Sequence, residues 1–310
     1  MRMKTQLPPV SYFIPAYNCA QTIVESVESL FHGNFLEGDE LIITNDGSSD
    51  NTPEILIQLK EKYPFIQIYN NEWNKGGSAT RNNCVRRASQ GLIFCLDSDN
   101  LLIPESMIPL REHQVREQSD ATYFQEQRYF SKNTETIDYI WKFRETTTLP
   151  DFLADHKNPG SSGNYLYTKD SWIKAGGYPE FAGALDTWGF GLYQLATGAK
   201  MSGLPGSGYW HRYGGESYYI RDMNKKNMSL AALQVMLPYI HLIHPDDIDY
   251  IMSRKHRETW LDHLNERPLR THTNQKGELA AHINPQMDKV KPGIIHRILM
   301  KLHRMIPIQY

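Results

Sequence analysis

The sequence predicts an α/β fold, in which a mostly parallel sheet is flanked by helices and followed by a helical C-terminal extension. Two observations predict it. Short β-rich runs alternate with apolar residues at helical spacing through the first hundred residues, and Gly- and Asp-rich segments follow the β-rich runs. Such alternation is typical of a parallel sheet covered by helices. Ligands of these sheets bind at the carboxyl ends of the strands, so a site is expected there.

Four short runs of β-type composition give the expected strands of the first half. Their ranges are 10–14, 41–44, 65–69 and 91–96. Between them, helices are predicted over 20–31 and 77–89 from apolar periodicity. Another helix is expected to begin at Thr52, as its cap, with Pro53 at the first helical position.

The second half of the chain has a less regular pattern. Expected here are a helix over 104–114, a strand over 121–130, a helix over 187–196 and helical structure over 228–264. Gly198 suits the end of the helix expected over 187–196. Residues 158–163, with the sequence NPGSSG, are predicted to form a flexible loop.

The chain is expected to form one main domain followed by smaller segments. The ranges are 1–225 for the domain, with halves at 1–100 and 101–225, then a helical extension at 226–266, a Pro-punctuated linker at 267–291 and an amphipathic helix at 292–307. The last segment has one apolar face and several basic residues. It either lies on an anionic membrane surface or docks on its own domain or on the partner of a homodimer.

Composition excludes several classes of function. Charged residues make up 22% and the net charge is -2, so no charge excess indicates a nucleic-acid partner. No stretch approaches the ~20 apolar residues that cross a bilayer. The three cysteines have no metal-type spacing and are interpreted as reduced thiols. We therefore expect a cytoplasmic protein, peripheral on the inner face of the membrane if its terminal helix binds there.

Two aspartates directly follow the fourth expected strand. Asp97 and Asp99 flank Ser98, and in extended chain residues two apart point the same way. Converging carboxylates repel unless a hard divalent cation, such as Mn²⁺ or Mg²⁺, lies between them. Such a cation can hold a diphosphate and neutralise its charge as it leaves. Taken alone, the pair fits a solvated acidic turn better.

Three other loops have sequences suited to a nucleotide. In TNDGSSD, Asp46 can accept a hydrogen bond from a base, and the glycine and serines allow a tight turn. IPAYN offers the ring of Tyr17 for stacking on a base. NKGGSATRN places glycines before a helix, so the backbone N–H groups at the helix start can bind an anion. Lys75 and Arg81 add positive charge nearby. Each loop by itself also fits a plain strand–helix connection.

In this order and spacing, IPAYN, TNDGSSDNT, NKGGSATRN and DSD resemble the family 2 glycosyltransferases, which have the Rossmann-like GT-A fold. The resemblance covers roughly the first half of the chain. It implies a nucleotide-diphospho-sugar donor, most often a UDP-sugar, bound with Mn²⁺ or Mg²⁺. Many relatives have aspartate where this chain has Asn100, which leaves the DxD motif intact but removes one nearby charge.

The resemblance also implies roles for residues of these motifs. The nucleotide and its phosphates would be bordered by Pro15, Ala16, Tyr17, Asn18, Gly76, Gly77, Arg81 and Ser98. Asp46 would pair with the base. Asp97 would lie by the ribose or the metal, and Asp99 would bind the metal.

In the second half, family members usually have an acidic pair before a helix, and its aspartate is the catalytic base. The match here is Asp186, although Leu185 stands where glutamate is common, and Glu180 is a second candidate. Asp186 would deprotonate the acceptor hydroxyl during in-line attack. Asp186 or Thr187 also fits the role of helix cap.

Further on, the segment YWHRYGGES resembles a late family segment. By that likeness His211 would complete the metal shell or contact the diphosphate, or Arg212 would contact the diphosphate instead. A lone histidine is more often a structural hydrogen-bonding residue, so that role stays open beside the one implied by the resemblance. Rings in and around this segment suit sugar faces, but core packing explains most of them. They are Trp188, Tyr209, Trp210, Tyr213, Tyr218 and Tyr219.

The sequence therefore predicts a metal-dependent transfer of a hexosyl or N-acetylhexosaminyl group to an acceptor hydroxyl, with inversion. The expected partners are a nucleotide-sugar donor and a glycan or glycolipid acceptor, in polysaccharide, lipopolysaccharide or other glycoconjugate synthesis. Leu185 and Asn100 leave open a catalytically inactive nucleotide-sugar-binding module on the same fold. A nucleotidyltransferase is disfavoured, because the loop after the first strand, PAYNCAQT, has no cation.

Overall fold

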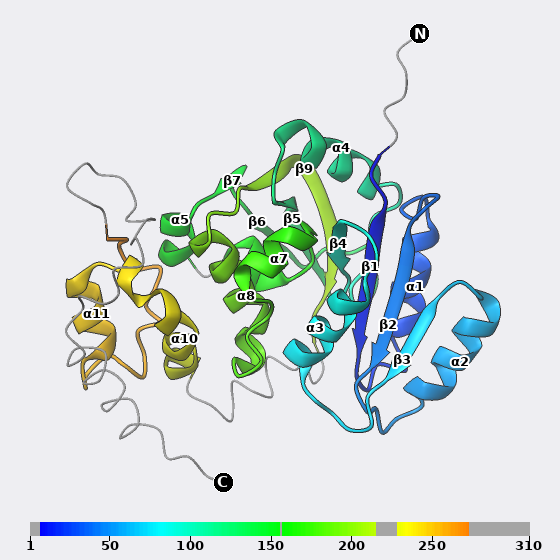
Figure 1. Cartoon of the computed structure of the whole chain (residues 1–310), viewed down its shortest axis with the longest axis horizontal. Coiled ribbons are helices and arrows are strands. Elements are labelled where there is room, and N and C mark those ends of the chain that lie inside the picture. The colour runs from blue at the N-terminus through cyan, green and yellow to red at the C-terminus, as the bar shows by residue number, and fades with distance from the viewer. Residues whose placement is uncertain (1–6, 156, 215–227, 273–310) are drawn as a thin grey trace.

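The computed structural model describes residues 7–155, 157–214 and 228–272 (Figure 1). Within them, nine strands form one sheet whose path runs β3-β2-β1-β4-β8-β5-β9-β7, with β6 paired to β5. Apolar side chains gather in two clusters, one on each face of this sheet. The prediction of a mostly parallel sheet flanked by helices is confirmed.

The first half of the sheet is parallel throughout. Its strands are β1 (Val10–Ala16), β2 (Glu40–Asn45), β3 (Gln67–Asn70) and β4 (Leu92–Cys95). Strand β1 lies between β2 and β4, and β3 is the outer strand. All four expected strands are present, and their carboxyl ends lie at one edge of the sheet.

Helices α1 (Ile23–Phe31), α2 (Thr52–Lys62), α3 (Gly77–Arg87) and α4 (Met107–Glu117) connect the early strands. The capping prediction for α2 is wrong by one position, since Asn51 is the N-cap and makes no side-chain capping bond. The Thr52 hydroxyl instead accepts a hydrogen bond from the backbone N–H of Cys19, at 2.9 Å. It thereby joins the loop after β1 to the loop after β2.

The second half of the sheet is mixed. Its strands are β5 (Ala121–Phe130), β6 (Tyr139–Lys142), β7 (Thr146–Thr147), β8 (Leu166–Thr168) and β9 (Met201–Arg212). Strand β8 runs antiparallel to both β4 and β5, whereas β9 runs parallel to β5. The long strand β9 therefore ends at the same edge as the parallel half.

Short helices cover this half. They are α5 (Leu149–Ala154), α6 (Pro159–Ser162), α7 (Lys169–Ala175), the 3-10 turn η1 (Gly183–Leu185) and α8 (Asp186–Ala196). The predicted flexible loop at 158–163 is wrong, because the Asn158 side chain caps α6 and most of the helix is buried. Gly160 and Gly191 allow α6 to pack closely on α8, since a Cβ added at Gly191 would lie 2.8 Å from the Cα of Gly160.

The described chain ends in a helical extension that lies at the opposite end of the molecule from β3 and α2 (Figure 1). It consists of α10 (Met228–Met236), η2 (Leu237–Leu242) and α11 (Pro245–Met252), followed by turns. Residues 267–272, where the linker was expected to begin, pack against it, and Arg270 pairs with Asp247 at 3.0 Å. The expected terminal helix at 292–307 lies outside the described residues. No helix within the described ranges has the length and apolar character to span a bilayer.

Candidate active site

The loops after β1 and β2 are fastened to each other at the carboxyl edge of the sheet. The side-chain oxygen of Asn18 accepts a hydrogen bond from the backbone N–H of Ser49 at 2.8 Å, and the Asn18 N–H donates to the Ser48 hydroxyl at 3.0 Å. Asn18 has a φ of 48°, a left-handed conformation that asparagine tolerates better than most residues. Two of the sequence motifs thus form one continuous surface.

Tyr17 is an exposed aromatic side chain on this surface, with 37% of its area open to solvent. Pro15 and Ala16 belong to the end of β1, where they pair with Thr44 and Asn45 of β2; Pro15 is half-buried and Ala16 is buried. Ser98 is half-buried and lies against the Cys19 thiol. The predicted nucleotide-lining residues are therefore close together, and only Tyr17 presents a ring.

Asp46 organises the glycine-rich loop. Its carboxylate, only 3% exposed, accepts hydrogen bonds from Asn71 Nδ2 at 2.7 Å and from the backbone N–H groups of Lys75 and Gly76, both at 2.9 Å. A carboxylate has about four lone-pair positions, so about one remains for a base. The local sequence does not reveal this, because the bonded N–H groups are 29 and 30 residues away.

Arg81 joins the two halves of the site. Its Nη2 donates to Asp97 Oδ1 and its Nη1 to Asp186 Oδ2, both at 2.7 Å. The three side chains are 12%, 21% and 5% exposed. Gly77 makes room for them, because a Cβ there would lie 2.7 Å from Arg81 Nη1 and 3.0 Å from Asp186 Oδ2. The structure thus brings these four predicted residues together.

Burial and the neighbouring Arg81 charge have opposite effects on the pKa of Asp186. Burial raises the pKa of Asp186, and the neighbouring Arg81 guanidinium offsets part of that effect. Asp186 Oδ1 also accepts the backbone N–H of Thr187 at 2.7 Å. Both oxygens of the expected base are therefore hydrogen-bonded in this state. Glu180, the second candidate, contacts Asn82 and Arg86 and not this bridge.

Asn164 is a site residue that the sequence analysis missed. Its Nδ2 donates to Asp97 Oδ2 at 2.8 Å, and its Oδ1 accepts the backbone N–H of Asp97 at 3.0 Å. Asp97 is thereby fixed on both oxygens, by Arg81 on one and Asn164 on the other. No local pattern around a single asparagine in the loop before β8 indicates this contact.

Asp99 differs from Asp97 in that its carboxylate is bonded to its own backbone N–H and not to neighbouring side chains among the described residues. It is half-buried, and within the described part of the chain it accepts no hydrogen bond from another side chain. Burial, together with the neighbouring charge of Asp97, raises the pKa of Asp99 to about 7. A desolvated carboxylate beside a second acid is the environment that a bound cation would relieve.

Strand β9 brings two more predicted residues to this point. Arg212 donates from its backbone N–H to Asn100 Oδ1 at 3.0 Å and from Nε to the Asp99 carbonyl at 3.1 Å, and it pairs with Glu25. His211 Nδ1 lies 2.8 Å from Gln127 Nε2. Burial lowers the pKa of His211 to about 4, with Asp97 opposing the shift, so the imidazole is neutral at physiological pH. A neutral imidazole is the form that can ligate a metal.

The metal prediction can be tested against these donors. Among residues 7–155, 157–214 and 228–272, no group of three or more His, Cys, Asp or Glu side chains forms a metal-binding cluster. A complete protein cage is not required, since Mg²⁺ at phosphate sites is commonly held by one or two carboxylates together with phosphate oxygens. Asp99 and the neighbouring Asp97 offer the one or two carboxylates that such a shared cation needs, whereas His211 does not form a three-residue group with them among the described residues. Their roles as ligands remain a prediction.

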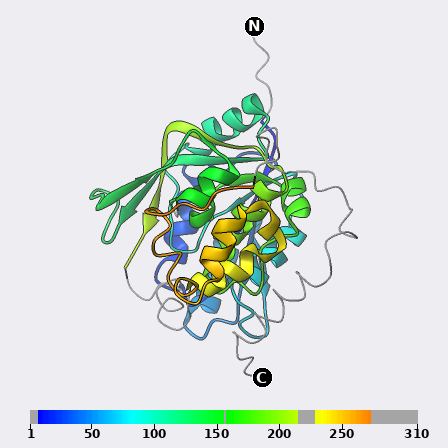
Figure 2. The same cartoon turned by 90° about the vertical axis from the view of Figure 1, so that its left-hand side faces the viewer.

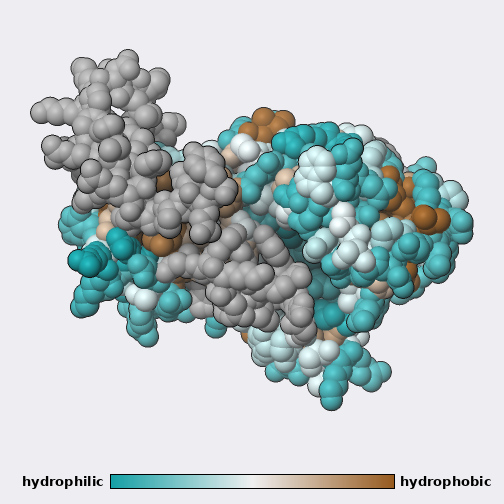
Figure 3. Space-filling model, turned by 90° about the horizontal axis from the view of Figure 1, so that it is seen from below, coloured by the Kyte–Doolittle hydropathy of each residue, from teal (hydrophilic) through white to brown (hydrophobic). Residues whose placement is uncertain are grey.

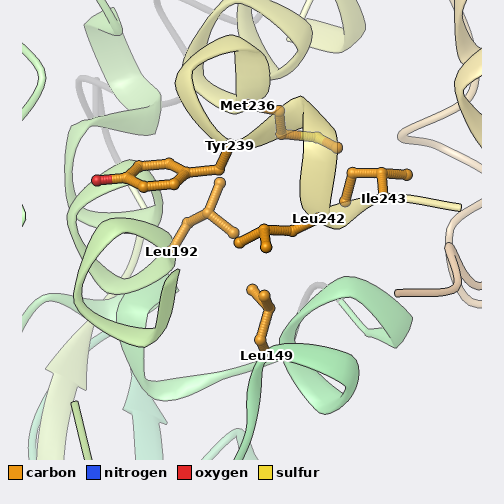
Figure 4. A pocket seen from close by; sticks show the side chains of 6 residues that line it. All are labelled: Leu149, Leu192, Met236, Tyr239, Leu242 and Ile243. Atoms are coloured by element: carbon orange, nitrogen blue, oxygen red, sulfur yellow. The ribbon is translucent and has the colours of Figure 1, made fainter. Parts of the chain in front are cut away.

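The surface around this edge is mainly hydrophilic where the structure describes it (Figure 3). A separate apolar cavity lies between α5, α8 and η2, lined by Leu149, Leu192, Met236, Tyr239, Leu242 and Ile243 (Figure 4). Its volume is about 10 Å³, roughly one water molecule at most, and its lining offers no polar partner. It is a packing gap between the main fold and the extension, not a ligand site.

Solved structures with the same architecture identify the class of fold as GT-A. Staphylococcus aureus TarS 1–349 in complex with UDP-GlcNAc matches with a TM-score of 0.60 at 17% identity, over 74% of this chain and 66% of that one. The mannosyltransferase PcManGT from Pyrobaculum calidifontis, in complex with GDP-Man and Mn²⁺, matches with a TM-score of 0.55 at 16% identity, over 76% and 65%. At these identities the likeness establishes the fold alone.

The sequence profile described as "Glycosyl transferase family 2" matches residues 11–176, and the chain belongs to that family. Among curated relatives, the poly-beta-1,6-N-acetyl-D-glucosamine synthases of Staphylococcus epidermidis and Staphylococcus aureus (strain COL) are each 33% identical over 97 residues. The aligned part is 31% of this chain and 23% of each relative, so the chain spans about a quarter of the length of the curated relatives it matches.

Proposed function

We propose that the protein transfers a sugar from a nucleotide-diphospho-sugar to the hydroxyl of a glycan or glycolipid acceptor. The observation that most supports this proposal is the half-buried carboxylate of Asp99 beside Asp97, at the carboxyl end of β4, which accepts no hydrogen bond from another side chain among the described residues. The fastened loops after β1 and β2, with Tyr17 exposed and Asp46 behind them, offer a nucleotide surface next to it. Family membership supports the same reaction class.

A UDP-sugar is the proposed donor, and Mn²⁺ or Mg²⁺ the proposed metal. A solved relative in fold binds UDP-GlcNAc, and another binds GDP-Man with Mn²⁺, so both nucleotides belong in any test. Asp99 would hold the metal, with Asp97 and His211 beside it. When bound, the metal would neutralise negative charge on the diphosphate leaving group.

Asp186 is the proposed general base. In a single displacement, the acceptor oxygen bonds to the anomeric carbon while the bond from that carbon to the diphosphate oxygen breaks, and its electron pair leaves with the nucleotide. The hydroxyl proton passes to the Asp186 carboxylate, and the configuration at the anomeric carbon inverts. Burial favours proton uptake by raising the pKa of Asp186. Because Asp186 is only 3% exposed, the proposal requires that substrate binding uncovers it.

A nucleotide-sugar-binding module without transfer activity is the second candidate. The observation that favours it is the closed bridge from Arg81 to Asp186, which leaves neither oxygen of Asp186 free of hydrogen bonds. Leu185, at the position where family members usually have an acid, favours the same alternative. The two candidates differ in whether donor turnover occurs.

Release of nucleotide diphosphate separates the two candidates. Purified protein is incubated with UDP-GlcNAc, UDP-glucose or GDP-mannose and Mn²⁺, with and without oligosaccharide acceptors, and with EDTA as the metal-free control. The enzyme proposal expects metal-dependent release that acceptor accelerates and that Asp186→Asn strongly reduces, while donor binding persists. Donor binding without release across the acceptor panel would establish the module instead. NMR of the product would show whether the anomeric configuration inverts.

We propose that the protein is cytoplasmic and that its acceptor is a growing glycan or glycolipid. We also propose that residues 1–225 form the catalytic domain. Peripheral membrane contact or dimer formation through residues 292–307 remains a proposal from sequence alone. Flotation with anionic vesicles, compared between the full chain and a chain ending at 291, tests the membrane alternative. Light scattering of the same pair tests the dimer.

A further inference from the structure

Three neighbouring strands place a row of rings across one face of the sheet, beginning at the site. Strand pairing sets Tyr129 of β5 directly opposite His211 of β9 on one side and Tyr139 of β6 on the other. Directly opposite residues share a face of the sheet. The Tyr129 ring lies 4.6 Å from His211 and 4.1 Å from Tyr139, centroid to centroid, and is stacked on the latter.

Tyr213, just beyond the end of β9, extends this row. Its ring lies 5.3 Å from Tyr139 and 6.1 Å from Tyr129. We name Tyr129, Tyr139 and Tyr213 the aromatic shelf. Tyr129 is 6% exposed and supports the other two, whereas Tyr139 is 42% and Tyr213 36% exposed. Figure 2 shows the β5–β6 hairpin projecting from the side of the molecule.

Core packing does not account for the exposed part of the shelf. Cross-strand aromatic pairs stabilise a hairpin, which explains Tyr129 against Tyr139. It does not explain Tyr213, which follows a different strand, β9, and leaves over a third of its surface in solvent. Rings that combine an apolar face with a hydroxyl are suited to ligands with apolar faces and polar rims. Pyranose sugars have that character.

The shelf is continuous with the proposed transfer site. The next residue of β9, Arg212, binds Asn100 through its backbone N–H at 3.0 Å and the Asp99 carbonyl through Nε at 3.1 Å, and the His211 ring lies 4.6 Å from Tyr129 at the buried end of the shelf. A saccharide lying on Tyr139 and Tyr213 would therefore have its end directed toward His211 and the two aspartates. A second copy of the chain or another protein would gain nothing from this continuity.

We propose that the aromatic shelf is the acceptor subsite, and that it binds a saccharide by stacking on Tyr139 and Tyr213. This inference rests on the proposed transferase function, because it assigns the acceptor to a place beside the donor site. It gives a ligand class to Tyr129 and Tyr139, which lie outside the sequence motifs, and to Tyr213 of the segment YWHRYGGES. It also predicts that acceptors with several sugar units bind better than monosaccharides, since the two exposed rings can each contact one unit.

Titration calorimetry with chitohexaose, maltohexaose and mannohexaose tests the shelf directly. The test variants are Tyr139→Ser and Tyr213→Ser. Tyr139→Phe keeps the ring, and Ile140→Ser is the matched control, because Ile140 is the next residue of β6, faces the opposite side and is 49% exposed. We expect at least one hexasaccharide to bind. The two Ser variants should weaken its Kd roughly tenfold, and the Phe variant and the Ile140 control by less than about twofold.

Two further measurements make the outcome decisive. Thermal unfolding identifies a variant whose hairpin no longer folds, and Tyr139→Leu, which keeps apolar bulk without a flat ring, then replaces it. Metal-dependent release of UDP without acceptor reports the donor site separately. The shelf proposal requires that sugar affinity falls at least about tenfold more than donor hydrolysis in the Ser variants.

The possible results distinguish the two proposals. Donor turnover with equal saccharide affinity in wild type and Ser variants would overturn the shelf and leave the transferase standing. Saccharide binding that depends on the rings, with no donor turnover in the wild type, would support the shelf and overturn the transferase. Absence of binding by any hexasaccharide at millimolar concentration would overturn the shelf. So would a change from dimer to monomer in the Ser variants with unaltered sugar affinity, because the rings would then form a subunit contact.

Discussion

Helices begin differently in the two halves of the molecule. At the starts of α1, α2 and α3, the N-cap residues make no side-chain capping hydrogen bond. At the starts of α5, α6 and α7, Thr148, Asn158 and Thr168 each make one. Helix α4 also has no cap of its own, but Asn34 accepts the N–H of Met107 from a distant loop, at 3.0 Å.

The difference follows the position of the proposed site. Helices α1, α2 and α3 begin at the carboxyl edge of the sheet, where loops and ligands meet, and α8 begins there with Asp186 and no capping bond at its N-cap. The first N–H groups of a helix need partners, and an anion or another loop can provide them. Away from the site, the N-cap side chains of α5, α6 and α7 provide such bonds, whereas at α2 the local partner is Asp50, one residue before the N-cap, which accepts the Thr52 N–H at 3.0 Å. A helix start whose N-cap side chain makes no bond therefore marks a place that the fold leaves for contacts from neighbouring loops or ligands.

The largest expected effect is the loss of donor turnover when Asp99 is replaced. Asp99 lies in the half of the molecule whose N-cap side chains make no capping bonds. Asp99→Asn keeps the shape of the side chain but removes the charge that the proposed metal requires. We expect metal-dependent release of UDP from a bound UDP-sugar to fall by about 10³-fold or more. The matched control is Asp170→Asn on α7, whose side chain is 74% exposed. Turnover by the Asp99 variant equal to that of the control would remove the metal from the proposal.

The next largest effect concerns the Arg81 bridge between the halves. Arg81→Met leaves Asp97 and Asp186 buried without their common partner. Removing one member of a buried ion pair costs about 3–5 kcal/mol, so we expect the free energy of unfolding in urea to fall by about that amount. Arg86→Met, on the same helix with a side chain that is 55% exposed, is expected to cost less than about 1 kcal/mol.

A second substitution sharpens this test. Asp186→Asn in the Arg81→Met background removes one of the two uncompensated charges, so part of the lost stability should return. The double-variant cycle measures the coupling between the residues. Independent, additive effects would show that Arg81 and Asp186 do not stabilise the fold as a pair.

A smaller effect is expected in the pH dependence of stability without metal. The pKa of Asp99 is raised to about 7 in the folded protein, whereas an unfolded chain has about 3.9. Between these values the folded state holds a proton that the unfolded state has lost. The contribution of Asp99 is therefore fully present below about pH 4 and is lost as the pH rises through about 7.

Urea unfolding in EDTA at several pH values measures this contribution. Wild-type stability, relative to that of Asp99→Asn, should decline from pH 4 to pH 8. Binding of Mn²⁺ should weaken below about pH 7, because the proton competes for the same carboxylate. Parallel stability curves for the two proteins would mean that Asp99 is ionised in the folded state throughout.

Much of the first half could be predicted from sequence, because its strands and motif loops are each specified by residues that are neighbours along the chain. Alternating periodicity located the four strands, and each motif loop follows the strand that positions it. Burial and strand direction then placed the motif residues at one edge, where the structure has them. Chain-local signals suffice when a site is built from the ends of consecutive strands.

The rest of the site depends on contacts between distant residues. Arg81 meets Asp186 across 105 residues, and Asn164 meets Asp97 across 67. Nothing in either local sequence distinguishes these pairings, since they exist only after α3, α8 and the loop before β8 have packed. The error at 158–163 has a related cause. The Gly and Ser residues of this segment predict flexibility, whereas Gly160 allows the close packing on α8.

The smallest predicted effect tests the comparison of helix starts itself. Thr148 and Asp151 form a capping box at α5, in which the Asp151 side chain accepts the Thr148 N–H at 3.0 Å. Thr148→Ala should lower the free energy of unfolding by about 1 kcal/mol, because it leaves an N–H at the helix start without its partner. Asn51→Ala at the start of α2, where the side chain makes no capping bond, should change the free energy of unfolding by less than about 0.5 kcal/mol. Urea unfolding with unchanged m-values measures both. Equal losses at the two sites would mean that Asn51 caps α2 in solution, and the contrast between the two halves would then disappear.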